Sequence, residues 1–295
     1  MLPVISYLIP SYNHEDYLPF LLESIVLDIK QLKVPAEVII IDDGSADRSL
    51  WVIQAWVEAN RDLFPISCVS QENRGIGAVL NRMVDLSRGE YLRVCASDDV
   101  LVPGSTQLLY EQFMLRPYLV CVLADAKVID AGGELIHSSS IAYHGGRINR
   151  LVEPQALPKE IIQHWCVAGP THLLKKNHHQ YMRYDESCRI EDYDLFLSLL
   201  EIPDSIFFIN EIVSLYRVHT TNVSKTTNPH RRIENIKTFL SIIERYIDRQ
   251  ILAGYLISVK YKTVAKIKFL QKKYLSCFFN LCLSTLFKMK SELQN

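Results

Sequence analysis

The chain has 295 residues, a formal net charge of −1 at pH 7 and 48% hydrophobic residues, which is enough to bury a large core. This composition excludes a disordered chain, and the nearly neutral charge gives no reason to expect a nucleic-acid partner. The charge is unevenly distributed, because residues 251–295 carry eight lysines and one acidic residue, a net +7, while the remaining 250 residues carry −8.

Apolar runs of strand length alternate with segments of helical length and spacing over the first half of the chain. The predicted strands are 4–10, 36–42, 66–70, 90–96 and 118–124, and the predicted helices are 15–33, 47–60, 76–88 and 104–116. This alternation is typical of βαβ units, and it predicts an α/β fold in which helices flank a mostly parallel, Rossmann-like sheet. The segment 130–158 is expected to form loops or a hairpin.

Paired carboxylates end two of these predicted strands. Asp42 and Asp43 end the strand 36–42, and Asp98 and Asp99 follow the strand 90–96. Ligands of open α/β sheets bind at the carboxyl ends of strands, and a hard divalent cation such as Mg²⁺ or Mn²⁺ neutralises adjacent carboxylates. Either pair alone would also suit a turn or a helix N-cap. Together they predict a site for a metal and a nucleotide.

Other ligand and targeting motifs are absent from the sequence. Gly75 and Gly77 begin a GxGxxG run, but Leu80 occupies the third glycine position, and no P-loop run occurs. The seven cysteines form no CxxC pair and the histidines have no zinc spacing, which favours a reduced, cytoplasmic protein. The start lacks the features of a signal peptide, and the uncharged stretch 274–287 is too short to span a bilayer.

The ordered set of motifs is similar to that of one enzyme family. The set comprises the strand that stops at Pro10 with the residues that follow it to Asn13, the two acidic pairs, and the segments 73–81, 88–92, 184–186, 191–196 and 216–224. Over roughly residues 3–225 it resembles the family 2 glycosyltransferases, which implies the GT-A fold and an inverting transfer of sugar from a nucleoside-diphosphate donor to a hydroxyl. A nucleotidyltransferase could also use acids at strand ends, but that activity would not explain the segments 191–196 and 216–224 together.

The resemblance assigns the residues that contact the nucleotide-sugar. They are Pro10, Ser11, Tyr12, Asp42, Asp43, Arg74 and Asp98. Asp43 is implied to accept a hydrogen bond from the base, with Asp42 beside it, and a carboxylate facing a ring imide favours a UDP-sugar. The Tyr12 ring either stacks on the base or lies buried under its loop. Arg74 either approaches the base and phosphates or is a solvated surface side chain.

The resemblance also implies a site for Mn²⁺ or Mg²⁺. Asp98 and Asp99 are its expected ligands, although either could instead bind the ribose, and His219 is a third ligand or else a structural histidine. The bound cation would stabilise the departing diphosphate. The family's motif usually begins with another Asp where this chain has Ala96. This departure supports an alternative, in which a catalytically impaired member only binds a nucleotide-sugar or a partner enzyme.

Glu191 and Asp192 begin an apolar-periodic segment that we expect to be a helix. Acids at a helix N-terminus are explained by the helix dipole alone. The resemblance nevertheless places the catalytic base at Asp192, where it would take the proton of the attacking acceptor hydroxyl, with Glu191 as the alternative. Asp194 is expected to face the protein or solvent. The segment 168–172 resembles the family's acceptor-side segment.

We therefore expect a catalytic domain over 1–225 and a helical extension over 226–295. Within the catalytic domain, residues 1–127 would bind the nucleotide-sugar and residues 128–225 the acceptor. The extension combines periodic apolar residues with lysines, so the part 251–290 is expected to lie on an anionic membrane surface.

The alternative is that the extension packs on the catalytic domain or on a second subunit in a homo-oligomer. The membrane alternative implies a peripheral enzyme on the cytoplasmic face of the inner membrane. Its acceptor would be a glycan or lipid-linked glycan, as in bacterial surface polysaccharide synthesis.

Overall fold

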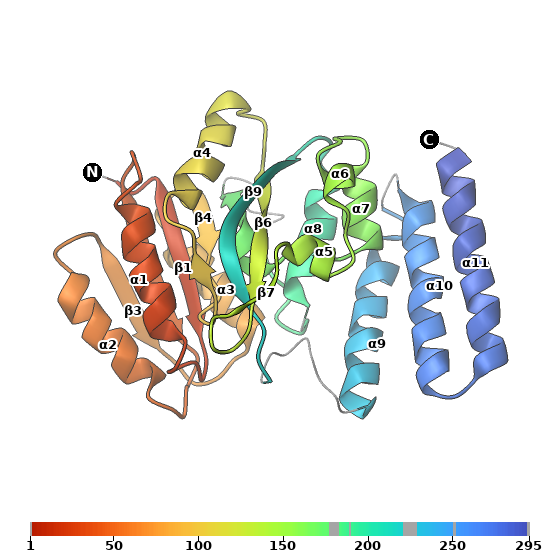
Figure 1. Cartoon of the computed structure of the whole chain (residues 1–295), viewed down its shortest axis with the longest axis horizontal. Helices are drawn as coiled ribbons and strands as arrows, with labels where there is room; N and C mark the ends of the chain where they lie inside the picture. The colour runs from red at the N-terminus through yellow and green to blue at the C-terminus, as the bar shows by residue number, and fades with distance from the viewer. Residues whose placement is uncertain (1, 177–182, 189, 221–228, 250–251, 294–295) are drawn as a thin grey trace.

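The computed structural model describes residues 2–176, 183–188, 190–220, 229–249 and 252–293. Within these residues a nine-stranded sheet occupies the middle of the molecule, and three long helices, α9 to α11, follow one another at the end that holds the C-terminus (Figure 1). The strands are β1 (Ile5–Ser11), β2 (Ala36–Asp42), β3 (Ile66–Ser70), β4 (Tyr91–Val94), β5 (Val100–Leu101), β6 (Cys121–Ile129), β7 (Leu135–His137), β8 (His172–Lys175) and β9 (Ile206–Arg217). The helices are α1 (Leu18–Ile29), α2 (Ser49–Asn60), α3 (Ile76–Leu86), α4 (Ser105–Leu115), α5 (Ser140–Tyr143), α6 (Ile148–Leu151), α7 (Leu157–Gln163), the 3₁₀ turn η1 (Gly169–Thr171), α8 (Glu191–Leu199), α9 (Pro229–Tyr246), α10 (Ala253–Leu270) and α11 (Tyr274–Leu293).

The first half of the sheet is parallel, as the alternating pattern predicted. Its strands lie in the order β3-β2-β1-β4, and β1 pairs with β2 so that Ser11 is opposite Asp42. All seven residues of β2 are buried. A parallel strand covered on both faces reads as a continuous apolar run, which explains the sequence Val38-Ile39-Ile40-Ile41. The polar residues Ser11 and Asp42 thus meet where the two strands end.

The second half of the sheet is mixed. The order continues through β8, β6, β9 and β5, in which β8 is antiparallel to both β4 and β6, and β9 is parallel to β6 and antiparallel to β5. The loop 95–99 between β4 and β5, called the acidic loop below, holds Asp98 and Asp99. Because β5 follows it directly and pairs with β9, the end of β9 lies next to the acidic loop. The segment 130–158 contains a strand, β7, that pairs with β6, and short helices.

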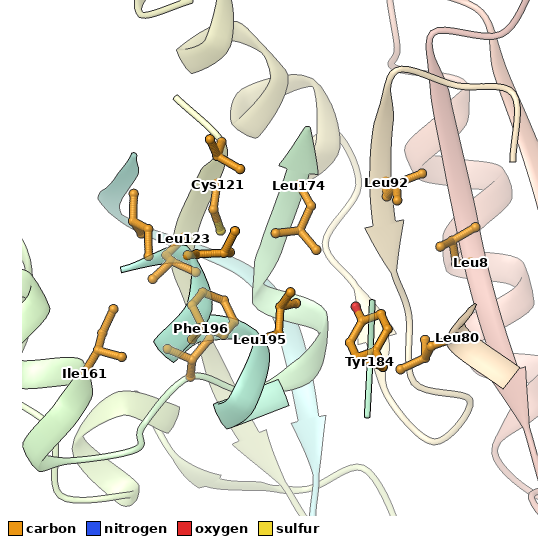
Figure 2. Packing of buried hydrophobic residues seen from close by; sticks show 14 of the residues in the cluster. Leu8, Leu80, Leu92, Cys121, Leu123, Ile161, Leu174, Tyr184, Leu195 and Phe196 are labelled. Carbon is orange, nitrogen blue, oxygen red and sulfur yellow. The ribbon is translucent and has the colours of Figure 1, made fainter. Parts of the chain in front are cut away.

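Apolar side chains from α3, α7 and α8 pack against one face of the sheet. Figure 2 shows part of this cluster, with Leu8, Leu92 and Leu174 from three strands and Leu195 and Phe196 from α8. Full burial of such a side chain stabilises the fold by roughly 1.5–3 kcal/mol. The packing of α8 fixes the position of its first turn, which carries Glu191 and Asp192.

The C-terminal helices share a core with the part of the chain that holds the sheet. Tyr193 and Leu197 of α8 form one apolar cluster with Ile242 of α9 and Leu256 of α10. A turn at Lys272 then separates α10 from α11. The predicted amphipathic pattern is therefore divided between a helix that packs on the body and a helix whose apolar residues are largely exposed. Within the described residues, none of the helices has both the length and the apolar character that a membrane span requires.

Candidate active site

Asp98 lies beside two histidines where the strands of the first half end. His219 Nε2 is 2.9 Å from Asp98 Oδ2, and these side chains are only 3% and 12% exposed. With His14, the three residues offer ligand atoms that all lie within 4.8 Å of one another. One carboxylate oxygen and two imidazole nitrogens at this spacing fit a divalent cation such as Mn²⁺. The structure thus brings the predicted ligands Asp98 and His219 together.

His14 was not among the residues selected from the sequence. Its backbone N–H donates to Ser49 Oγ at 2.9 Å, and its Nδ1 is 2.7 Å from Ser97 Oγ, which orients the ring. Tyr17 also packs against His219, with ring centroids 4.8 Å apart. His14 follows the end of β1 by three residues, so the strand-end reasoning that selected Ser11 and Tyr12 would have reached it.

Asp99 has a different environment from Asp98. Its Oδ1 accepts the backbone N–H of Arg217 at 2.7 Å, and the side chain is buried. Burial, and then the negative charge of Asp98, raise the pKa of Asp99 well above its usual range. Arg217 Nε donates to the Asp98 carbonyl at 2.8 Å. Hydrogen bonds of Asp99 and Arg217 therefore connect the acidic loop to β9. Asp99 is not part of the cluster formed by His14, Asp98 and His219.

Asp43 is engaged within the protein. Its two carboxylate oxygens accept hydrogen bonds from the side chain of Gln71 and from the backbone N–H groups of Arg74 and Gly75, at 2.8–2.9 Å. Gly75 has φ +84°, a conformation that glycine adopts without strain, so this carboxylate holds the turn that leads into α3. Asp43 therefore shapes the loop beside the predicted base site.

Asp42 and Ser11 present buried polar atoms without partners. Asp42 Oδ2 accepts the Ser45 N–H at 3.2 Å, whereas its Oδ1 has no partner among the described residues, and neither has Ser11 Oγ. Both residues are at most 2% exposed. An unsatisfied buried polar group costs roughly 1–3 kcal/mol, so a ligand that supplied a donor here would recover part of that cost.

The other predicted donor-site residues lie nearer the surface. Tyr12 is 48% exposed, so its ring does not lie buried under the loop, and Pro10 is half-buried. Arg74 is exposed, and its guanidinium is 3.6 Å from the Glu186 carboxylate. Surface ion pairs of this kind contribute about 0–1 kcal/mol. Arg74, in the loop between β3 and α3, thus contacts the segment before α8.

Glu191 and Asp192 begin α8, as the sequence predicted, and both are half-buried. The Trp165 side chain acts on the Asp192 carboxyl as a nearby donor that lowers its pKa, and the Tyr193 N–H donates to Asp192 Oδ1 at 2.7 Å. Burial raises the pKa of Asp192 to about 6, while burial and then the charge of Asp192 raise the pKa of Glu191 to about 8. The two carboxyl groups therefore titrate as a coupled pair, and both have pKa values above the usual range.

Close packing against α3 positions the segment that leads to α8. Asn81 exchanges two hydrogen bonds with the Tyr184 backbone, at 2.9 and 3.0 Å. A Cβ on Gly77 would lie 3.0 Å from the Asp185 carbonyl oxygen, so the glycine permits this approach. The Gly75 to Gly77 run is thus explained by backbone geometry and packing. Asp194 pairs with Arg245 of α9 at 3.0 Å and faces the protein.

Residues 6–177 match the family model described as glycosyl transferase family 2, which is more than half of the chain. The chain belongs to this family. Its α/β fold with a C-terminal helical extension agrees with the fold that the sequence motifs implied.

Several curated proteins are similar to this family 2 glycosyltransferase. It is 37% identical to a chondroitin synthase of Escherichia coli over 134 residues, which cover 45% of this chain and 19% of that protein. It is 26% identical to the chondroitin synthase of Pasteurella multocida over 261 residues, 86% of this chain and 24% of that protein. The chain thus spans a quarter or less of these two synthases. The glycosyltransferase GlyG of Streptococcus pneumoniae is 24% identical over 88% of this chain and 84% of its own length.

Solved structures of transferases share the fold. TarS residues 1–349 of S. aureus, in complex with UDP-GlcNAc, superpose with a TM-score of 0.64 and 16% identity over 90% of this chain and 72% of that one. The mannosyltransferase PcManGT of Pyrobaculum calidifontis, in complex with GDP-Man and Mn²⁺, has a TM-score of 0.60 and 14% identity over 100% of this chain and 76% of that one. These likenesses establish the fold of this glycosyltransferase.

Proposed function

We propose that this glycosyltransferase moves a sugar from a UDP-sugar to an acceptor hydroxyl with inversion at the anomeric carbon. The observation that supports this most directly is the cluster of Asp98, His219 and His14, which follow the strands β4, β9 and β1. The UDP-GlcNAc bound to TarS supports a uridine donor and the transfer of an N-acetylhexosamine or another hexose. The chondroitin synthase names support a role in bacterial polysaccharide synthesis.

Asp98, His219 and His14 would hold Mn²⁺ or Mg²⁺, and mixed imidazole and carboxylate ligands favour Mn²⁺. The bound cation supplies positive charge where the departing diphosphate develops negative charge. Ser97 keeps the His14 ring oriented through its hydroxyl. The partnerless oxygens of Asp42 and Ser11 are the candidates for receiving the N–H or hydroxyl hydrogens of the nucleoside.

Asp192 would act as the general base for the acceptor hydroxyl. A base is most effective when its pKa lies near the working pH, and burial places the pKa of Asp192 at about 6. The Tyr193 N–H orients the Asp192 carboxylate, and a proton shared within the Glu191 and Asp192 pair would limit their charge repulsion. Attack from the face opposite the diphosphate would then invert the anomeric centre.

The α10–α11 pair supports contact with an anionic membrane. The two helices pack through small polar residues, with Ser258 Oγ donating to the Ser284 carbonyl at 2.8 Å and Ser291 close to Gly254. The exposed side of α11 is instead apolar, with residues that include Leu275, Phe278, Phe279, Leu286 and Leu293. Helices that pack through small residues and expose apolar ones suit a lipid environment, and nearby lysines suit anionic headgroups. We therefore place the enzyme peripherally at the cytoplasmic face of the inner membrane.

Donor hydrolysis provides the test of the proposed function. UDP-GlcNAc, UDP-GalNAc, UDP-Glc and GDP-Man would each be incubated with the protein in Mn²⁺ and in excess chelator. We expect release of UDP from one or more UDP-sugars only when the metal is present. Ala96 favours the alternative of an impaired member that only binds. Calorimetric binding of a UDP-sugar without hydrolysis or transfer under any of these conditions would support that alternative.

A further inference from the structure

A groove of about 1000 Å³ lies between the catalytic body and the three C-terminal helices. Trp165 and Ile190 line it on the body side, and α9, α10 and α11 supply most of the remaining lining. Ile190 directly precedes α8, whose first turn holds Asp192, and Trp165 packs against Tyr193 of the same turn with ring centroids 5.2 Å apart. On α10 the lining extends from Val259 to Leu270, about 16 Å of helix. The groove thus begins beside the candidate catalytic base and follows α10.

Three cations line this groove. Arg232 comes from α9, and Lys262 and Lys266 lie one turn apart on α10. No carboxylate lines the groove within the described part of the chain, and no described acid forms an ion pair with these three side chains. Partial burial, and then the charges of Lys262 and Arg232, lower the pKa of Lys266. Like charges one turn apart destabilise a helix slightly, so a bound anion would relieve a repulsion that the fold leaves uncompensated.

Apolar side chains supply much of the remaining lining. Phe239 of α9, Phe269 and Leu270 of α10 and Leu281 of α11 line the groove. Phe269 and Leu281 are 60% and 45% exposed, although such side chains favour burial. Figure 1 shows that the turn between α10 and α11 lies at the same end as the start of α9. Phe269 and Leu270 lie at this turn, so the apolar lining continues toward the exposed apolar residues of α11.

We propose that this groove binds the phosphate and the first part of the hydrocarbon chain of a long-chain lipid-phosphate acceptor. The phosphate or diphosphate would lie against Arg232, Lys262 and Lys266, and the chain along Phe269 and Leu281. The acceptor hydroxyl, on a sugar that the lipid phosphate or diphosphate carries, would then lie toward Trp165 and Asp192. This inference rests on the proposed transferase function and adds the class of acceptor to it. Cations and aromatic walls in one groove match an amphiphilic anion better than a neutral soluble glycan.

Calorimetric titration of the full chain with farnesyl phosphate tests the inference. We expect saturable binding of farnesyl phosphate, and binding at least tenfold weaker for farnesol and for inorganic phosphate. The double variant Lys262→Gln/Lys266→Gln should weaken farnesyl phosphate binding at least tenfold, because it removes two charge-assisted contacts with the phosphate. Equal affinity for inorganic phosphate would instead identify a site for free anions and overturn the proposal.

A matched variant controls for nonspecific electrostatics. Lys260→Gln/Lys268→Gln removes the same charge from the same helix, but these two lysines do not line the groove, and Lys260 pairs with Glu244. It should bind farnesyl phosphate within about twofold of wild type. The proposal is overturned if both double variants lose binding equally, or if Lys262→Gln/Lys266→Gln binds like wild type. Unchanged circular dichroism and melting temperature would confirm that each variant is folded.

Donor hydrolysis separates this proposal from the proposed function. Lys262→Gln/Lys266→Gln should hydrolyse the UDP-sugar at the wild-type rate while its KM for a lipid-phosphate acceptor rises at least tenfold. If no protein hydrolyses or transfers sugar but farnesyl phosphate binding still depends on these lysines, the transferase function fails and the groove assignment stands. If transfer occurs but is independent of these lysines, the groove assignment fails and the function stands.

Discussion

Asp98 and Asp99 are neighbours in the chain, yet their surroundings give them different properties. Asp98 lies 2.9 Å from His219 and near His14, whereas Asp99 is buried and accepts the Arg217 N–H. The first arrangement suits metal binding, and the second suits structural support. The two carboxylates should therefore respond differently to substitution.

Asp98→Ala should reduce Mn²⁺ affinity and metal-dependent donor hydrolysis at least tenfold with little change in stability. Asp99→Ala should instead lower the free energy of unfolding by about 1–3 kcal/mol, because it leaves the buried Arg217 N–H without an acceptor. Calorimetry with Mn²⁺ and urea denaturation measure the two effects. The assignment is wrong if Asp99→Ala loses the metal while Asp98→Ala retains it.

Asp192→Asn should reduce turnover by about 10²–10⁴-fold, the usual contribution of a general base, while donor and metal binding persist. Glu191→Gln should cost less. In the wild type, kcat/KM should rise as pH increases through about 6, because Asp192 must lose its proton to act as a base. If Glu191→Gln is inactive and Asp192→Asn transfers sugar at a near wild-type rate, the base is Glu191.

Glu191→Gln should also change how stability depends on pH. Burial and the charge of Asp192 raise the pKa of Glu191 to about 8 in the folded protein, above its value of about 4.3 in an unfolded chain. Stability from this group is thus fully present below about pH 4 and is lost as pH rises through about 8. The variant should therefore melt above wild type at pH 8.5 and close to wild type at pH 4.5. Equal differences at both pH values would argue against a raised pKa.

Among the secondary-structure elements, α10 and α11 differ most in how they meet the rest of the molecule. Tyr255 and Leu256 of α10 are buried in the cluster that also holds Tyr193 and Leu197 of α8. Truncation near Gln250 would therefore expose apolar side chains of α8. Helix α11 contacts mainly α10, so substitutions on its exposed side test membrane contact without this complication.

The triple variant Leu275→Gln/Phe279→Gln/Leu286→Gln should reduce co-sedimentation with anionic vesicles at least tenfold and leave donor hydrolysis unchanged. These side chains are 60% or more exposed, so their replacement should cost the fold little. As a control, Trp51→Gln removes an equally exposed apolar side chain from α2 and should bind vesicles like wild type. The heptad-like spacing of 275, 279, 282, 286, 289 and 293 would also suit a second copy of the helix. Equal vesicle binding by wild type and triple variant, together with loss of a dimer in light scattering, would assign α11 to subunit contact.

At the scale of the whole molecule, segments distant in sequence meet through a few specific contacts. Arg217 joins the end of β9 to the acidic loop, and Asn81 joins α3 to the segment before α8. Arg245 of α9 reaches Asp185 and Asp194 from the other side. The cluster of His14, Asp98 and His219 and the acids Glu191 and Asp192 are therefore positioned by one connected set of contacts. The helix α9 takes part in this set through Arg245.

Local pattern was sufficient to predict much of the secondary structure of residues 1–127. The strand 36–42 and the start of α3 at Ile76 were predicted at the observed positions, because their apolar periodicity and flanking glycines act over a few residues. The same patterns placed Asp42, Asp98 and Asp192 at or next to element ends. The family also followed from the order of these motifs.

The tertiary structure decided which of these residues meet. The mixed second half of the sheet, the pairing of Asp99 with Arg217 and the joining of His14 to Asp98 all depend on segments roughly 80–120 residues apart, which no local pattern records. The division of the C-terminal segment into a packed helix and an exposed one likewise depends on the apolar face that α8 offers to α10. Sequence periodicity specifies which side of a helix is apolar, but only the fold determines whether a partner covers it.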